Sequence, residues 1–122
     1  MTKEQALYQF FNQFDIIGYR NTSVPDDVIF PYLTFDVPIS SFEEDPVSIT
    51  LNLYFYTDSE AEPDAKAEEI RQAIGMGGKL LHCDGGLIWL KCGTPWCQSL
   101  VDETNANIKR RYINITAEYL TI

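Results

Sequence analysis

The side chains best suited to chemistry lie between His82 and Cys97, where one histidine and three cysteines occur within a short stretch. Imidazole and thiolate groups are common zinc ligands. Cys92 and Cys97 have four residues between them, which suits one half of a zinc site. His82 and Cys83 are adjacent, however, and neighbouring side chains of a strand point to opposite faces. They cannot both join one tetrahedral site, so we expect unligated, partly buried thiols.

A nucleophilic cysteine–histidine pair is the other chemistry that these residues suggest. Such a pair needs a third, orienting group and a thiol made acidic by positive surroundings. The single histidine instead lies beside Asp84 in an expected hairpin. The glycine-rich segment 75–78 follows an expected helix, whereas a phosphate-binding loop precedes one. We therefore predict no enzyme activity, no catalytic residue, no metal and no cofactor. A small enzyme or regulator using these thiols stays an alternative.

Length and composition predict a single globular domain over residues 1–122, because 45% of the residues are hydrophobic and 13% are aromatic. Eighteen acidic residues against nine basic ones give a net charge of −9, which argues against binding to a nucleic-acid backbone or to an anionic membrane. No apolar run approaches the roughly 18 residues of a membrane helix, and no signal peptide is evident at the N-terminus. The odd number of cysteines favours reduced thiols in a cytosolic setting.

The acidic residues are unevenly distributed along the chain. Between Asp26 and Glu69, twelve acidic residues are opposed by Lys66 alone, whereas the rest of the chain has six acidic and eight basic residues. Three of the basic residues are contiguous, at 109–111. A subunit that is acidic in one part and basic in another can stack head to tail with copies of itself. A soluble acidic surface beside an ordinary basic strand end explains the same pattern.

The N-terminal half contains one expected helix and two expected strands. Thr2 and Gln5 form a capping-box pattern, followed by apolar residues at helical spacing up to Gly18. Residues 19–30 have the composition of a loop. Residues 31–38 are extended and bounded by prolines, which suits an edge strand or the start of a strand better than the centre of a sheet. Residues 47–56 alternate strictly, so we predict a strand with one buried face and one wetter face that carries Tyr54 and Tyr56.

The C-terminal half is expected to form a helix, a hairpin and a long strand. Pro63 and Gly75 are typical of a helix start and a helix end. Residues 84–86 indicate a hairpin turn between strands 79–83 and 87–92, residues 94–107 look irregular, and residues 109–121 alternate as a central strand. The fold class is therefore α+β, with a mostly antiparallel sheet and two helices packed on one side. The expected shared core contains Phe10, Phe14, Leu51, Leu53, Ile70 and Ile115.

This order of elements resembles a family of phage proteins. The relevant segments are the strand FPYLTF at 30–35, the strand ITLNLYFY at 49–56 with Thr57 and Asp58 before a helix, and the terminal strand ending ITAEYL at 115–120. In this pattern the chain resembles the tail-terminator and tail-completion proteins, which join head to tail in long-tailed bacteriophages and prophages. The resemblance covers nearly the whole chain and concerns the pattern of elements rather than a diagnostic motif.

The resemblance implies a structural, non-enzymatic subunit that forms a homo-oligomeric ring, expected to be a hexamer. Such rings bind the tail tube protein on one face and the head-completion protein on the other, and DNA passes through the lumen without specific binding. The expected location is the virion head–tail junction, and the host cytoplasm during assembly. Another neck component, such as a head–tail connector or minor capsid protein, is an alternative. A monomeric module that binds one protein through its tyrosine-rich sheet face is another.

Charge placement suggests where such a ring would meet DNA and its own copies. The loop 40–46 contains three acidic residues and no basic one, and we expect it to face the lumen. Acidic residues on the second helix are expected to contact the basic start of a neighbour's last strand. The expected lumen residues are Glu43, Glu44 and Asp45, and the expected interface residues are Glu62, Asp64, Glu68, Lys109, Arg110 and Arg111.

Overall fold

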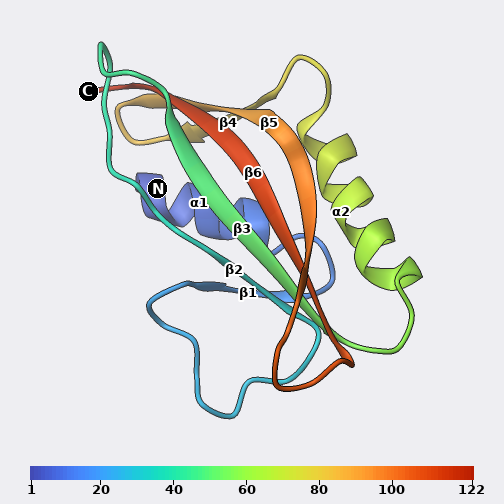
Figure 1. Ribbon diagram of the computed structural model, residues 1–122. Helices are drawn as coiled ribbons and strands as arrows, with labels where there is room; N and C mark the ends of the chain where they lie inside the picture. The colour runs from blue at the N-terminus through green and yellow to red at the C-terminus, as the bar shows by residue number, and fades with distance from the viewer.

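The computed structural model describes all 122 residues, which form two helices and one six-stranded sheet (Figure 1). Neither helix is long and apolar enough to cross a membrane. The elements follow one another as α1 (Lys3–Phe11), β1 (Ile17–Arg20), β2 (Tyr32–Phe35), β3 (Val47–Tyr56), α2 (Ala61–Ile74), β4 (Lys79–Cys83), β5 (Gly86–Val101) and β6 (Ile108–Thr121).

The sheet has the strand order β1-β2-β3-β6-β5-β4. Only the β1–β2 pair is parallel, and all other neighbours are antiparallel. β3 pairs with β6 along its whole length, with Leu51 opposite Ile113 and Leu53 opposite Arg111. The predicted α+β class with a mostly antiparallel sheet is confirmed, as is the central position of the last strand.

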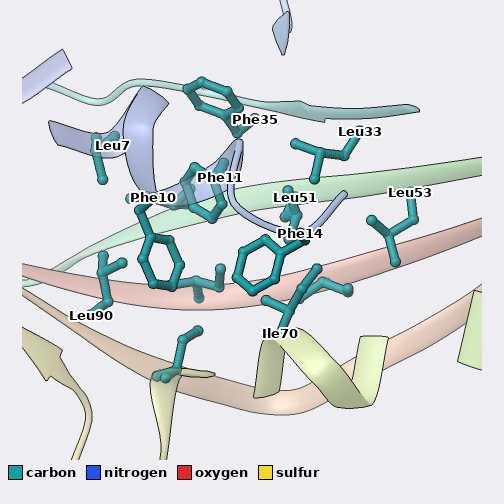
Figure 2. Close-up of a cluster of buried hydrophobic side chains, with 14 of the residues drawn as sticks. Leu7, Phe10, Phe11, Phe14, Leu33, Phe35, Leu51, Leu53, Ile70 and Leu90 are labelled. Atoms are coloured by element: carbon teal, nitrogen blue, oxygen red, sulfur yellow. The ribbon is translucent and has the colours of Figure 1, made fainter. Parts of the chain in front are cut away.

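The strand side chains that form the hydrophobic core lie on one face of the sheet, and both helices pack against that face (Figure 1). α1 contacts both edge strands, β1 and β4, whereas α2 packs across β3, β5 and β6. A sheet whose two edges contact one helix must curl around that helix. Figure 2 shows the resulting core, in which phenylalanines from α1 and the segment after it meet leucines of the strands and Ile70 of α2. All six residues predicted for the core belong to this cluster.

The predicted capping box at the start of α1 is present: the Thr2 hydroxyl accepts from the Gln5 amide, and the Gln5 side chain accepts from the Thr2 amide. The helix ends at Phe11, earlier than expected. The Asn12 side chain explains the early end, because its Nδ2 donates to the Tyr8 carbonyl while its Oδ1 accepts from the Gly18 amide at 2.8 Å. Gly18 therefore lies in β1 and does not end the helix.

Two segments expected to be irregular form strands. Residues 17–20 form β1, which pairs with β2, so β2 is not an edge strand. Pro31 instead directly precedes β2, which fits the other predicted position, the start of a strand. Residues 97–101 continue β5 and pair with residues 109–113 of β6, beyond a register shift between Cys92 and Cys97. The four residues inside this bulge break the alternation on which the sequence-based prediction depended.

Truncation of Leu53 to alanine tests the assignment of the sheet's faces. Leu53 is fully buried in the middle of β3, so we expect the free energy of unfolding to fall by about 2–5 kcal/mol. Denaturant unfolding followed by circular dichroism measures this loss. Ser48→Ala is the matched control on the exposed face of the same strand, and its effect should stay within about 0.5 kcal/mol. Equal effects of the two substitutions would contradict the assignment.

Candidate interaction surface

The face of the sheet opposite the helices is not covered by any other element of the chain (Figure 1). Because side chains alternate along strands, the open face consists of the residues that do not enter the core. Its main aromatic and polar members come from five strands and keep partial exposure. They are Tyr19, Tyr32, Thr50, Asn52, Tyr54, Tyr56, Arg110, Tyr112, Asn114, Leu87, Trp89 and Lys91.

Aromatic rings form a continuous cluster at one end of this open face. Tyr32 and Tyr54 lie opposite each other on β2 and β3, and their rings stack with centroids 4.7 Å apart at 11°. The ring centroid of Phe30 lies 5.3 Å from that of Tyr32 and 5.9 Å from that of Tyr56. The rings of Tyr19 in β1 and Tyr32 meet edge to face, with centroids 6.2 Å apart. Burial, and then the proximity of Tyr54, raise the pKa of Tyr32, so its hydroxyl stays a hydrogen-bond donor. Partly exposed tyrosines of this kind are enriched in protein interfaces.

Arg110 is held beside the aromatic cluster by the strand register. It lies opposite Tyr54 across the β3–β6 pair, and its guanidinium carbon is 5.6 Å from the centre of the Tyr54 ring. Its Nε and one terminal nitrogen donate to Asn52 Oδ1 at 3.1 and 2.9 Å. Unlike the other three arginines of the chain, Arg110 has no carboxylate partner. The open face thus presents an ordered but unpaired cation next to stacked tyrosines.

The open face is less acidic than the rest of the molecule. Its charged residues are Arg110, Lys91 and Glu118, with Lys91 placed 3.6 Å from Glu118 and 3.7 Å above the Trp89 ring. The face therefore carries a net charge of about +1, in a chain whose net charge is −9. Such a surface favours an acidic partner.

The structure corrects the predicted pairing between the acidic helix and the basic strand end. Arg111 was expected at a subunit interface, but its side chain is buried and pairs within the chain with Asp64, at 2.9 Å, and with Glu60. Lys109 also reaches Glu60, at 3.7 Å. Burial opposes the charge of Arg111, but its bonds to the two carboxylates outweigh burial and raise its pKa above the ordinary value. Arg111 and Asp64 thus attach the start of α2 to β6.

Of the two other predicted interface residues on α2, one makes an ion pair within the helix and the other makes none. Glu68 pairs with Arg71 on the same helix, at 2.6 Å. Glu62 is exposed and makes no ion pair or side-chain hydrogen bond. Arg110 and Glu62 are therefore the members of the predicted set that make no ion pair within the subunit. They lie on the open face and on the helix layer, and hence on opposite sides of the sheet.

The predicted lumen residues lie in the exposed loop between β2 and β3. Glu43 and Asp45 are exposed and make no ion pair, whereas the Glu44 carboxylate accepts hydrogen bonds from Ser40 Oγ at 2.6 Å and from the Ser41 amide at 2.8 Å. These two bonds hold the pKa of Glu44 below its usual value. Glu44 thus orders the loop, and Glu43 and Asp45 provide its free negative charge.

The thiols are placed as ordinary partly buried side chains. Cys83, Cys92 and Cys97 pack against the core, while His82 is exposed on the other side of β4. Burial raises the pKa of Cys83, of Cys92 and of Cys97, so these thiols stay protonated at neutral pH and are poor nucleophiles. No three histidine, cysteine, aspartate or glutamate side chains come together in a way that could hold a metal ion.

Comparison with known proteins gives no relative: no family model, curated protein or solved structure matches this chain.

Part of this surface could be predicted from the sequence. The alternation of residues 47–56 identified Tyr54 and Tyr56 on the wetter face. Tyr19 and Phe30 were not identified, because both lie in a stretch with the composition of a loop. Only the pairing of β1 with β2 brings Tyr19 to the aromatic cluster.

Replacing Asp64 by alanine tests the attachment of α2 to β6. The buried Arg111 guanidinium would lose one of its two carboxylate partners, so we expect the free energy of unfolding to fall by about 1–2 kcal/mol. Glu62→Ala is the matched control, because it removes an acidic residue of the same helical turn that has no partner. Chemical denaturation measures both variants. A loss at position 64 no greater than that at position 62 would argue against this attachment.

Proposed function

We propose that this chain is a structural subunit of the head–tail junction of a long-tailed phage or prophage, and that it acts there as a tail terminator. In this role, copies form a ring of six that caps the tail tube and presents a surface to the head-completion protein. The observation that carries the proposal is the α+β fold, with a mostly antiparallel sheet and two helices on one side, because this is the fold class that the resemblance to that family implies. The exposed tyrosine face supports it, because a subunit that assembles needs a surface for protein contact.

The acidic loop between β2 and β3 fits the lumen of such a ring. Glu43 and Asp45 are exposed, and no basic residue within the loop neutralises them. Negative charge on the inner wall repels the DNA backbone, so that DNA passes without adhering. The ring would be made in the host cytoplasm and would remain in the virion at the joint between head and tail.

Two alternatives are supported by particular observations. Another neck component would use the same fold and the same exposed face. A monomeric binding module would use the tyrosine cluster to hold a single protein partner. An enzyme based on the cysteines is less favoured, because burial raises the thiol pKa of Cys92 and of Cys97.

Tail assembly provides the direct test of the proposed function. Purified protein would be added to tail tubes assembled without it from the tail tube protein of the same phage or prophage. We expect a ring at one end of each tube by negative-stain electron microscopy, and subsequent binding of the head-completion protein to that end. Failure of the protein to bind either end of the tubes would refute the role as a terminator.

Charge reversal in the loop tests its position in the lumen. Glu43→Lys combined with Asp45→Lys leaves the Glu44 hydrogen bonds in place, so the loop should keep its shape. We expect capped tubes to retain linear DNA at low salt and to release it as the salt concentration rises. Asp26→Lys with Asp27→Lys is the control, because it changes the net charge equally at another exposed loop. Equal DNA retention by the two variants would contradict the lumen assignment.

A further inference from the structure

We propose that the open face of the sheet is covered by helix α2 of a second copy of this chain, with Arg110 of one subunit facing Glu62 of the next. The proposal rests on the ring function proposed above and names the surface by which the subunits associate. Arg110 is ordered and lacks a carboxylate partner, and Glu62 is exposed and unpaired. The positive charge of Arg110 therefore complements the negative charge of Glu62.

The open face has the properties of a surface that becomes buried. It carries five aromatic rings in contact with one another near one end of β2 and β3, including the stacked pair Tyr32 and Tyr54. Aromatic residues and arginine are the types that contribute most to binding in protein interfaces. No helix of this chain reaches that face, because both pack against the core on the opposite side.

The outward face of α2 is suited to lie on a sheet. Its outermost residues include Ala61 and Ala65, which are exposed and separated by one helical turn, so a strand surface can approach the helix backbone closely. Glu62 and Glu69 flank this line of small residues, and Glu69 is the partner of Lys66. The segment from Asp58 to Gly75 contains six acidic and two basic residues. Its negative charge complements the open face, whose net charge is about +1.

The two surfaces lie on opposite sides of the subunit, so the contact is head to tail. A contact between different surfaces leaves one free surface of each kind and therefore adds further copies, which close into a ring where the rotation between neighbours allows it. A symmetric dimer through the two open faces would instead bring two cationic surfaces together and leave both α2 helices uncovered. Charge complementarity thus favours the arrangement that the ring requires.

Charge exchange tests this contact. Arg110→Glu and Glu62→Lys should each weaken self-association about tenfold or more, and the double variant should recover most of it. Sedimentation velocity and native mass spectrometry over a range of protein concentrations measure the effect. Lys79→Glu and Asp26→Lys are matched controls, since they make the same charge changes at exposed residues without ion pairs, and they should associate like the wild type. Glu62 has no contact that folding requires, so Glu62→Lys remains informative even if Arg110→Glu fails to fold.

Three results would overturn the proposed contact. They are unchanged association of the Glu62→Lys variant, a wild-type protein that stops at a dimer, and a wild-type protein that remains a monomer at the highest concentration reached. None of these decides the proposed function, which is judged separately by whether wild-type protein caps tail tubes. A protein that caps tubes but fails the charge exchange would keep its proposed role and lose this interface.

Discussion

The register between β3 and β6 determines where nearly every other part of the molecule lies. Ten consecutive residue pairs join the two strands, and every second pair places two side chains on the core face. A slip of one residue would turn Leu51 and Leu53 to solvent and bring tyrosines into the core. Because one face carries the core residues, both helices pack there, and the opposite face carries mainly tyrosine, threonine and asparagine beside Trp89, Arg110 and Lys91. The open surface is thus a direct consequence of how the core is built.

The same register places a cation within the core layer. Arg111 lies opposite Leu53, on the face that is otherwise apolar. A buried guanidinium is costly unless its donors are satisfied. The two carboxylates are those of Glu60, at the N-cap of α2, and Asp64, in its first turn. Negative charges near the positive end of the helix dipole are themselves stabilising. The ion pairs therefore fix where α2 begins on the sheet, beside the buried ring of Pro63.

Much of this architecture followed from local patterns. The capping box of α1, the alternation of β3 and β6, Gly75 at the end of α2 and the hairpin before β5 depend on neighbouring residues alone, and all were predictable. The parallel strand β1 was not predictable, because four residues of mixed polarity become a strand only when β2 lies beside them. Residues 97–101 of β5 were not predicted as a strand, because the bulge between Cys92 and Cys97 interrupts the alternation of side chains. The different roles of Arg110 and Arg111 were also not predicted. These adjacent side chains point to opposite faces of the sheet, so Arg110 lies on the open face and Arg111 pairs with carboxylates within the fold.

The curl of the sheet around α1 also affects solubility. Edge strands expose unpaired backbone groups, and long flat edges recruit foreign strands into aggregates. Here the outermost strands are β1, with four residues, and β4, with five, and both contact the same helix. Because β4 pairs only with Gly86–Leu90, the rest of β5 has no strand partner on its outer side. Arg20 on one edge and Lys79 on the other add charges that discourage strand addition. The long strands β3 and β6, which would be the most hazardous edges, have partners on both sides. The backbone groups at the centre of β3 and β6 are therefore unavailable to a foreign strand.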